Sequence, residues 1–591
     1  MSKLRIGEFL NPSILACPTA GGIPKLIRHI TIMNAALLAV FSLFCFFLSY
    51  LFYSRFLAKK IYEIDSDIVT PAREFEDGID YVPTNKYVLF GHHFTSVAGA
   101  APIIGPAIAV IWGWLPALLW VVFGTIFIGA VHDFGCLVLS AKNKGHSIGD
   151  LTGNIIGKRA RALFLTIIFF LTWIVIAVFA YVIATLFSQF PTAVLPVNIQ
   201  IIIAVTIGLV IYRTKFGILI PSLIALLVLY GFIYFGTYTP VHLPAFIGGQ
   251  TESWIVLLLV YAFIASVLPV WLLLQPRDFI NSHQLLVGLG IMYMGLFIVH
   301  PPMVAPALNL EVDGGLPWFP FLFITIACGA ISGFHGLVGS GTTSKQLNNI
   351  KDSRMIGFGS MLGEGSLGLM SVIASTAGFA TLTAWKSHYS SWSTAGSMDA
   401  KIGAFVNGGA YFLKEGLMLP DGFGTTLIAV IVISFAATTL DTSTRIQRYI
   451  TSELGEIYNI KILTNRFVAA AIAAFTPLIL IFGGEGLSWK RLWPVFGATN
   501  QMLAGLSLLV LTVYLYRKGR NILFTLIPLI FLIFMTSTAM VLSLKEFIKS
   551  RNWILTILSV LLLSFSAWIT LEAINVVRNL KKKDNGADDL V

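Results

Sequence analysis

The sequence predicts an all-α, polytopic membrane protein with about 15 transmembrane helices, two of them discontinuous. Of its 591 residues, 57% are hydrophobic and 11% are charged, and the mean hydropathy is +0.84. A soluble domain carries charge on roughly a quarter of its residues. The chain also contains a series of apolar stretches of about 17–25 residues, the length that a helix needs to cross a bilayer. Two of these stretches are rich in Gly, Pro, His and hydroxyl side chains, a composition that interrupts a helix.

The apolar stretches define the expected helices in order along the chain. They lie at 31–53, 91–112, 117–140, 162–189, 198–212, 216–236, 253–274, 284–301, 318–342, 356–382, 422–443, 465–483, 492–515, 522–543 and 552–577. The fifth is short enough to be tilted or re-entrant. The Gly-rich segment 402–418 is interpreted as a surface or re-entrant helix. Residues 1–30 lack the continuous apolar stretch of a cleavable signal peptide, so the first span is expected to remain as an anchor.

The distribution of Lys and Arg predicts the orientation of these helices. The loops 190–197, 237–252 and 302–316 contain no Lys or Arg, whereas the loops on the opposite side are basic. Because cytoplasmic loops carry the excess of positive charge, we expect residues 54–90 and the C-terminal tail in the cytoplasm. The net charge of +11 therefore reflects membrane orientation rather than nucleic-acid binding. The basic residues within 1–30 contradict this pattern, and a further helix or hairpin there would remove the contradiction.

The number of spans predicts an inverted repeat. Seven spans lie between 91 and 301 and seven between 318 and 577, and because seven is odd, the second set starts from the opposite side of the membrane. The expected organisation is an N-terminal region with an anchor helix (1–53), a cytoplasmic linker (54–90), a first core repeat (91–302), a second core repeat (318–515), peripheral C-terminal helices (522–577) and a cytoplasmic tail (578–591).

The two interrupted spans occupy matching positions in the two repeats. The first is interrupted between Gly91 and Pro106, and the second between Cys328 and Thr343. Irregular backbone at membrane depth is tolerated only where it lines a cavity or is buried in protein. Paired interruptions are therefore the best sequence indication of the binding site of a secondary transporter. Close helix packing through small residues is the alternative for either span alone.

We predict that a solute binds to backbone and hydroxyl groups of both interruptions. Exposed N–H groups at a helix N-terminus attract a carboxylate, and C-terminal carbonyls attract a cation. No Lys or Arg is expected deep in a span, and Lys345 lies at the edge of the second one. The predicted substrate-binding residues are Thr95, Ser96, Gly99, Ala100, Ala101, Gly105, Ser332, Gly333, His335, Gly339, Ser340, Gly341 and Thr342.

Histidines and carboxylates within the spans are the candidates for ion coupling. Histidine changes charge near neutral pH, and carboxylates inside a membrane are rare and functional. The candidates are His92, His93, Asp133, Glu364 and Asp441. Each has a structural alternative, such as a histidine bonded to a backbone carbonyl or an i,i+4 ion pair between Asp441 and Arg445. Three histidines could converge on a metal ion, but no ligand spacing supports such a site, and no cofactor is expected.

Five motifs in order resemble the carbon starvation protein A family. They are DYVPT at 80–84, LFGHHF at 89–94, HDF at 132–134, SGFH at 332–335 and SGTTSK at 340–345. The resemblance covers about residues 50–520. It implies an inner-membrane secondary transporter, and peptides and pyruvate are the solutes associated with the family. It also implies kinship with the amino acid–polyamine–cation superfamily, whose core is an inverted repeat of five plus five helices like the leucine transporter fold.

This kinship gives a second interpretation of the hydroxyl groups around Asp441. In transporters with the leucine-transporter core, the third helix of the second repeat supplies hydroxyl oxygens to a sodium site that faces the first interruption. Thr438, Thr439, Thr442 and Ser443 resemble that arrangement, and carbonyls near Ala98 and Ala101 would complete it. The alternative is that these hydroxyls bond back to their own helix. If Asp441 itself occupies the position, a proton could replace sodium.

Other functions fit the sequence less well. Neither HExxH nor GxGD is present, which argues against an intramembrane protease, and no GxxxxGK[ST] motif indicates ATP as the energy source. A channel is the remaining alternative. The leading expectation is a proton-coupled symporter that imports a small carboxylate such as pyruvate, or short peptides, by alternating access. Sodium is the second expected coupling ion.

Overall fold

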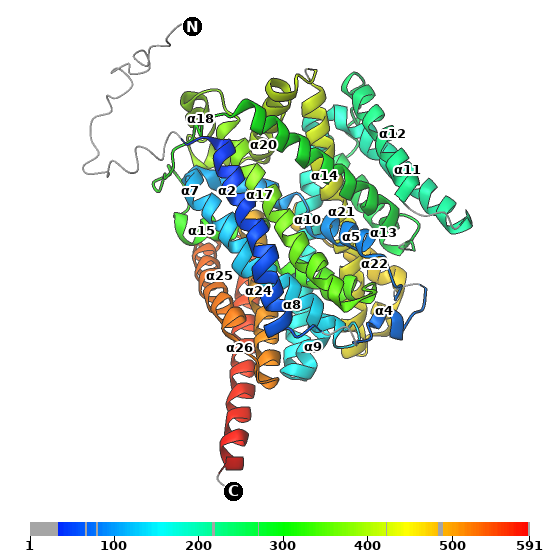
Figure 1. The fold of residues 1–591 in the computed structure, drawn as a ribbon, viewed down its shortest axis with the longest axis vertical. Helices are drawn as coiled ribbons and strands as arrows, with labels where there is room; N and C mark the ends of the chain where they lie inside the picture. The colour runs from blue at the N-terminus through cyan, green and yellow to red at the C-terminus, as the bar shows by residue number, and fades with distance from the viewer. Residues whose placement is uncertain are drawn as a thin grey trace, which may run out of the picture.

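The computed structural model describes residues 33–64, 68–78, 81–214, 219–269, 271–420, 422–482 and 489–588. These residues form a helical bundle without a named strand (Figure 1). The helix or hairpin considered within residues 1–30 lies outside the described residues. The all-α membrane architecture that the composition predicted is confirmed, since long apolar helices account for most of the described chain.

Twelve helices of the described residues are long and apolar enough to cross a membrane. They are Ala35–Ile61, Trp114–Ala141, Lys158–Gln189, Pro191–Val210, Ile220–Thr237, Gln250–Val267, Leu274–Val299, Ile350–Ala377, Phe423–Ile457, Leu492–Arg517, Leu523–Lys549 and Trp553–Leu580. A thirteenth span is the bent pair Lys86–Val97 and Ala101–Trp112, whose halves meet at 47°. The expected count of about fifteen is not confirmed. The stretch at 318–342 is two short helices, and the stretch at 465–483 is the shorter apolar segment Arg466–Phe482.

The helices that form the core and its surroundings have the following bounds. In the first half they are α2 (Ala35–Leu48), α4 (Pro71–Glu74), α5 (Lys86–Val97), α6 (Ala101–Ala109), α7 (Trp114–Leu119), α8 (Ala130–Ala141), α9 (Ile148–Ile155), α10 (Lys158–Gln189), α11 (Val194–Thr214), α12 (Leu219–Thr237), α13 (Gln250–Val267) and α14 (Leu274–Val299). In the second half they are α15 (Trp318–Thr325), α16 (Gly333–Gly341), α17 (Ser360–Ala377), α18 (Leu382–His388), α19 (Trp392–Ala395), α20 (Met398–Leu417), α21 (Phe423–Ile457), α22 (Arg466–Phe475), α23 (Leu478–Phe482), α24 (Trp489–Arg517), α25 (Leu523–Lys549) and α26 (Trp553–Asp588).

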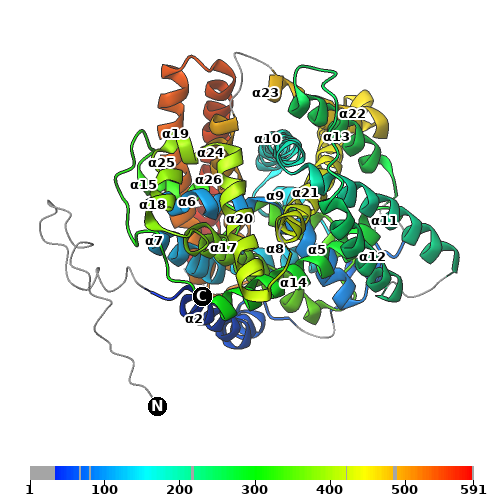
Figure 2. The same cartoon turned by 90° about the horizontal axis from the view of Figure 1, so that it is seen from above.

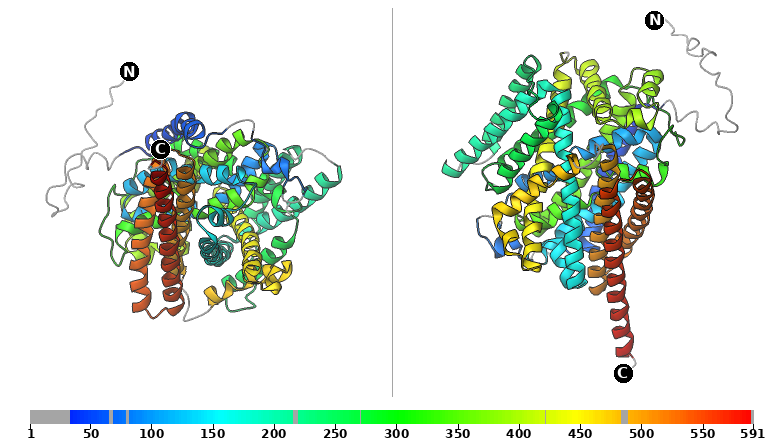
Figure 3. Two further views of the ribbon diagram at one scale, coloured as in Figure 1. Left: turned by 90° about the horizontal axis from the view of Figure 1, so that it is seen from below. Right: turned by 180° about the vertical axis from the view of Figure 1, so that it is seen from behind.

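Two long helices, α10 and α21, pack against each other in the middle of the bundle (Figure 2). Helix α5 packs on α14 and α21, and α16 packs on α8 and α24. Helices α25 and α26 pack on α24 at the edge of the bundle, and the end of α26 extends beyond it (Figure 3). The faces of α2, α12, α25 and α26 that point outward carry exposed Leu, Ile and Phe side chains, as surfaces that contact lipid require.

The first break comprises residues 98–100 between α5 and α6. The backbone of Ala98 leaves the helical region, with φ −79° and ψ 64°. Pro102 follows at the start of α6, where its missing N–H is tolerated because the first turn has no intrahelical partner. The Gly and Pro residues that predicted an interruption therefore produce one at this position.

The second break comprises residues 326–332 between α15 and α16. Gly329 has φ +86°, a conformation that side chains with a Cβ rarely adopt, and Ser332 is extended immediately before α16. Helix α6, which follows the first break, lies against the start of the second break, since a Cβ on Gly105 would lie 2.5 Å from the carbonyl oxygen of Thr325 and 3.2 Å from Cα of Ile326. The broken spans run in opposite directions, because α5 and the end of α16 share one end of the bundle.

The two ends of the bundle carry different loops. Helices α4 and α9 and the C-terminal end of α26 lie at one end, and α7 and α18 lie at the other (Figure 1). The segment after α16 joins the first end, since Lys345 and Gln346 accept from the backbone of Val82 and Thr84. The first end carries the loops that the charge pattern assigned to the cytoplasm. Two expected boundaries change. The first helix continues to Ile61, past the expected end of the anchor at residue 53, and the segment 402–418 lies in a packed helix, α20, rather than on the surface.

Candidate functional site

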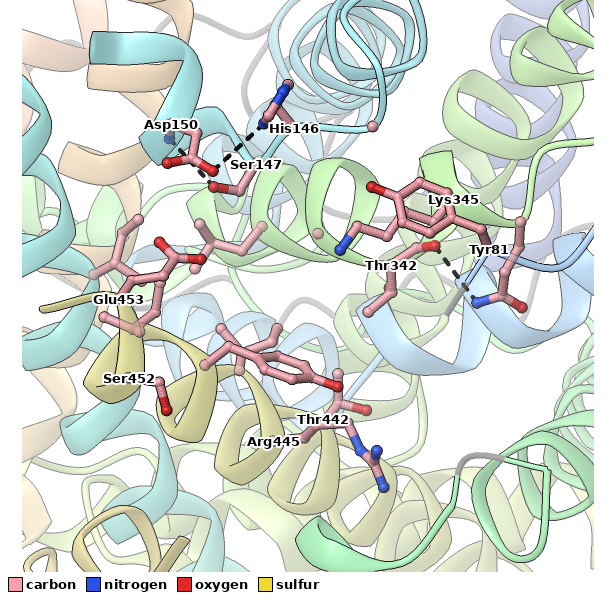
Figure 4. Close-up of a pocket in the computed structure, with 18 of the residues that line it drawn as sticks. Tyr81, His146, Ser147, Asp150, Thr342, Lys345, Thr442, Arg445, Ser452 and Glu453 are labelled. Carbon is pink, nitrogen blue, oxygen red and sulfur yellow. Dashed lines mark hydrogen bonds and ion pairs between the residues drawn. The ribbon is translucent and has the colours of Figure 1, made fainter. Parts of the chain in front are cut away.

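A cavity of about 430 Å³ opens at the end of the bundle that carries α4 and α9 (Figure 4). Its volume lies in the range of roughly 300–1,000 Å³ that is usual for small-molecule sites. Both broken spans reach it, through His92 in α5 and through Gly341 and Thr342 at the end of α16. Helix α21 supplies much of the remaining wall, including Thr442, Arg445, Tyr449 and Glu453.

The cavity contains groups of both charges. Lys345 lies on one side of it and Glu453 on the other (Figure 4). The ammonium of Lys345 lies 5.3 Å from the ring centroid of Tyr81, and Oε2 of Glu453 is buried without a hydrogen-bond partner among the described residues. Asp150 is paired with Arg161 at 2.6 Å, and Arg445 donates to the carbonyls of Ala265 and Leu268. Lys345 and Glu453 thus face the cavity from opposite sides, and a second carboxylate, Glu456, lines it one turn beyond Glu453.

The opposite end of the broken span at α6 is closed by packed side chains. The hydroxyl of Tyr389 donates to the carbonyl of Ala107 at 2.6 Å. The indole of Trp112 donates to the carbonyl of Leu316 at 3.2 Å, and its ring lies 5.1 Å from that of Trp392. The site is thus open toward the end with α4 and α9 and covered at the end with α18.

The first broken span carries its predicted residues in a packed environment. Nδ1 of His92 lies 3.0 Å from Oδ2 of Asp278, and Nδ1 of His93 lies 2.8 Å from the hydroxyl of Thr343. Thr95 donates to the carbonyl of Gly91 at 2.9 Å, and the hydroxyl of Ser96 is buried with no hydrogen-bond partner in the described part of the chain. Of these residues, only His92 lines the cavity.

The second break is held by side chains from neighbouring helices. Gln501 and Trp120 donate to the carbonyl of Phe323, and Thr125 donates to that of Gly329 at 3.0 Å. Asn500 accepts from the backbone N–H of Phe334 at 3.0 Å and also bonds to Ser332. The open backbone groups of this segment are therefore satisfied by protein, as membrane depth requires.

The predicted substrate residues of the second broken span divide into two groups. Gly341 and Thr342 line the cavity. Ser332, Gly333, His335, Gly339 and Ser340 are fully buried against neighbouring helices. Ser340 donates to the carbonyl of Gly336 at 2.6 Å and accepts from the backbone N–H of Ile148 at 3.1 Å. In the first span, Gly99, Ala100, Ala101 and Gly105 are likewise buried.

A buried arginine that the sequence analysis assigned to a loop forms the centre of an ionic network. Arg277 lies in the first turn of α14, is 2% exposed, and pairs with Asp441 of α21 and with Asp278 at 3.1 Å. Tyr261 donates to Asp441 at 2.9 Å, and Asp278 also contacts His92. Arg277 lies at the end of its span rather than deep within it, yet it is enclosed by the bundle, which the sequence analysis did not predict. The i,i+4 alternative for Asp441 is wrong, since Arg445 bonds to carbonyls instead.

Two predicted coupling residues, Asp133 and Glu364, converge at the second break with His335, which was predicted to bind substrate. Nδ1 of His335 lies 2.8 Å from Oδ2 of Asp133, and its Nε2 lies 3.3 Å from Oε2 of Glu364. The other oxygen of Asp133 contacts Nδ1 of His132 at 2.7 Å. These groups come from α8, α16 and α17 and are fully buried. Cys328, which the sequence analysis did not select, lies beside His335 and Glu364.

The hydroxyl cluster of α21 lies beside the first break and also bonds back to its own helix. Thr439 faces the first break, because a Cβ on Gly99 would lie 2.3 Å from its hydroxyl oxygen. The hydroxyls of Thr438, Thr439 and Ser443 nevertheless donate to carbonyls of their own helix. Thr438 also accepts from the amide of Asn281 at 2.9 Å, and Thr442 lines the cavity.

Comparison with known proteins identifies the family. The family described as Carbon starvation protein CstA matches residues 34–384 and 379–539. The chain belongs to the CstA family. It is 33% identical over 560 residues to the peptide transporter CstA of Campylobacter jejuni, which covers 85% of this chain and 79% of the relative. It is 32% identical over 590 residues to the pyruvate/proton symporter BtsT of Escherichia coli, with 86% and 81% covered.

These relatives are transporters, so the chain is a multi-pass membrane transporter and not an enzyme. The peptide transporter CstA of Bacillus subtilis is 33% identical over 536 residues, covering 85% of this chain and 89% of the relative. Among solved structures, a mutant of the manganese transporter of Eremococcus coleocola aligns with a TM-score of 0.39 at 14% identity, over 87% of this chain and 99% of that protein. The leucine transporter fold expected from the resemblance is not confirmed.

Proposed function

We propose that this CstA family member is a secondary active transporter that imports short peptides or a small carboxylate such as pyruvate, together with protons, by alternating access. The observation that carries this proposal is the cavity, because both discontinuous spans and α21 contribute to its wall. A site bounded by discontinuous helices from two repeats is the usual geometry of alternating access. We assign the cavity end to the cytoplasm, and the membrane to the inner membrane, from the basic loops and the family.

The polarity of the cavity supports a solute that carries both charges. Lys345, next to Gly341 and Thr342, would bind a carboxylate, and Glu453 on the facing side would bind an ammonium group. Charge-assisted hydrogen bonds of this kind are stronger than neutral ones. A zwitterionic peptide engages both groups, whereas pyruvate engages only the first. We therefore favour short peptides, and pyruvate is the second candidate because one relative is named a pyruvate/proton symporter.

The ionic network at the inner side of the cavity supports coupling to protons. His92 lines the cavity and contacts Asp278, which in turn contacts Arg277. When the imidazole of His92 carries a proton, it is a second cation beside Asp278 and weakens the attraction between that carboxylate and Arg277. Because Arg277 also holds Asp441 on α21, a proton at His92 would alter the attachment of α21 to α5 and α14.

Sodium remains the alternative coupling ion because Thr439 lies directly against the first break. A sodium site there would need the hydroxyls of α21 to turn away from the carbonyls of their own helix.

The test is uptake by purified protein in proteoliposomes, with labelled pyruvate compared with a labelled dipeptide and with proton and sodium gradients imposed separately. We expect concentrative dipeptide uptake driven by the proton gradient. Lys345→Gln and Glu453→Gln should each raise KM roughly tenfold, equivalent to about 1.4 kcal/mol. Lys351→Gln, an exposed lysine that does not line the cavity, is the matched control. Flux that ignores both gradients would contradict a coupled carrier.

A further inference from the structure

A cluster of three potential ligands is buried at the second break, away from the cavity. Cys328 belongs to the break itself, His335 to α16 and Glu364 to α17. One potential ligand atom from each lies within 4.8 Å of the other two, and the residues are 6%, 0% and 0% exposed. None of the three lines the cavity described above.

Glu364 and His335 are each oriented by a second group that leaves one atom free, whereas Sγ of Cys328 accepts from the side-chain amide of Asn500 at 3.6 Å. Oε1 of Glu364 accepts from the backbone N–H of Gly329 at 3.2 Å, which leaves Oε2. Nδ1 of His335 contacts Asp133 at 2.8 Å, which leaves Nε2. Metal-bound histidines almost always donate their other ring N–H to a carboxylate or carbonyl, and carboxylate ligands are themselves hydrogen-bonded.

The free atoms lack hydrogen-bond partners. Nε2 of His335 and Oε2 of Glu364 approach to 3.3 Å, yet neither makes a hydrogen bond among the described residues. Buried polar atoms are normally satisfied, so two that face the same point need an explanation. A thiolate and a carboxylate together carry two negative charges, which a divalent cation would neutralise, whereas uncompensated charges in such a place are unfavourable.

We propose that Cys328 Sγ, His335 Nε2 and Glu364 Oε2 bind a divalent transition-metal ion, with Zn²⁺ as the best match. Sulfur, imidazole nitrogen and carboxylate oxygen are the three ligand types of zinc sites, and three protein ligands leave a fourth position for water. Soft thiolate ligands disfavour Mg²⁺ and Ca²⁺. The ion would join the second break to α17 and hold that segment still, so the proposal does not depend on which solute is transported.

The ligand spacing explains why the sequence analysis predicted no metal. Cys328 and His335 are separated by a helix boundary, and Glu364 comes from the following span, so no compact motif is formed. The three histidines that were considered do not converge either, because His92 and His93 contact Asp278 and Thr343.

The test is the metal content of the purified full-length protein, measured by inductively coupled plasma mass spectrometry without any transport assay. We expect about one zinc per chain, and loss of it in Cys328→Ser and His335→Gln. Cys45→Ser, a cysteine of α2 outside the cluster, should retain the metal. Replacement by Co²⁺ should give a thiolate-to-cobalt absorption band that Cys328→Ser lacks.

A second measurement covers variants that fold poorly. Wild-type protein stripped with a chelator should unfold at a lower temperature and regain stability on addition of Zn²⁺, with no such recovery in Cys328→Ser. Metal-free wild-type protein that is monodisperse, shows no cobalt band and does not respond to Zn²⁺ would overturn the proposal. His335 would then be a histidine held between the carboxylates of Asp133 and Glu364, and the proposed transport function would be unaffected.

Discussion

At the residue scale, Arg277 links α14 to α21 through a buried ion pair. It is buried, it pairs with Asp441 on α21, and it also contacts Asp278 and Tyr261. Its partner groups come from two helices besides its own. Removing one member of a buried ion pair leaves the other charge uncompensated, which makes such a pair sensitive to substitution even where the intact pair adds little stability.

We predict that Asp441→Asn destabilises the protein by about 3–5 kcal/mol, since Arg277 would remain buried without its main counterion. Thermal unfolding in detergent measures the change. The double variant Arg277→Gln with Asp441→Asn should recover part of the loss because no unpaired charge remains. A single variant as stable as the wild type would mean that Asp278 alone compensates Arg277.

A substitution at Gly105 tests the contact between α6 and the start of the second break. A Cβ there would lie 2.5 Å from the carbonyl oxygen of Thr325, a backbone atom with little freedom to move. We predict that Gly105→Ala costs about 1–3 kcal/mol through overpacking and reduces uptake. Gly290→Ala on α14, where no atom lies within 4 Å of the added Cβ, is the control. It should be neutral or slightly stabilising. Equal effects of the two substitutions on thermal unfolding would rule out a steric cause.

Individual residues were predictable where their type is unusual for a membrane. Asp133, His335, Glu364 and Asp441 were selected because ionisable groups inside spans are rare. Their grouping was not predictable, because Asp133 and His335 are 202 positions apart. Arg277 was missed because it precedes the apolar part of α14 and resembles a loop residue. The available signal was Asp441 itself, since a buried carboxylate needs a counterion.

At the scale of the elements, the two breaks differ in how firmly they are held. Side chains of Trp120, Thr125, Gln501 and Asn500 bond to the backbone around the second break. The first break is held mainly by side-chain packing, with Thr439 in contact with Gly99. We therefore expect α5 and α6 to move during transport relative to a fixed second break.

A substitution at Asn500 tests whether side-chain hydrogen bonds hold the second break in place. We predict that Asn500→Ala lowers stability by about 1–3 kcal/mol, because the backbone N–H of Phe334 would lose its acceptor in a buried position. Differential scanning fluorimetry measures it. Asn198→Ala, at an exposed position of α11 where the amide donates to the carbonyl of Val194 in its own helix, should have little effect. An unchanged unfolding temperature for Asn500→Ala would indicate that water replaces the amide.

The positions of most helices could be predicted from the length of the apolar stretches, and the positions of the breaks from their Gly and Pro residues. The sequence-based prediction fails where tertiary packing determines the structure of a segment. The segment 402–418 looked only mildly apolar, yet it is the packed helix α20, because Gly408 allows close approach to the carbonyl of Ala374. The stretch at 465–483 has the composition of a span but is divided at residues 476–477.

At the scale of the whole molecule, the structure is open at one end and closed at the other. The cavity faces the end with α4 and α9, and Tyr389, Trp112 and Trp392 cover the opposite end of α6. The proposed orientation of this asymmetry in the membrane rests on loop charge, which the sequence alone supplies. Two of the covering residues were not predictable, because Tyr389 and Trp392 come from the short helices α18 and α19 or the turn between them, outside any predicted span.

We predict that a cysteine at Thr342 reacts with a membrane-impermeant maleimide only from the cytoplasmic side. Thr342 lines the cavity and is partly exposed there. The measurement compares inside-out with right-side-out vesicles, and the protein without the added cysteine gives the background. Added dipeptide should slow the labelling. Faster labelling in right-side-out vesicles would reverse the proposed orientation.

The depth of the cavity determines across which part of the protein the membrane voltage falls. If water fills it as far as His92, the electric field falls mainly across the dry remainder of the bundle, between His92 and the cover formed by Tyr389 and Trp112. An elementary charge that crosses the full field exchanges roughly 2.3 kcal/mol per 100 mV. A proton that reaches His92 from the closed side has then gained most of that energy. Uptake of an electrically neutral peptide with one proton would consequently carry current, and its rate would rise as the cell interior becomes more negative.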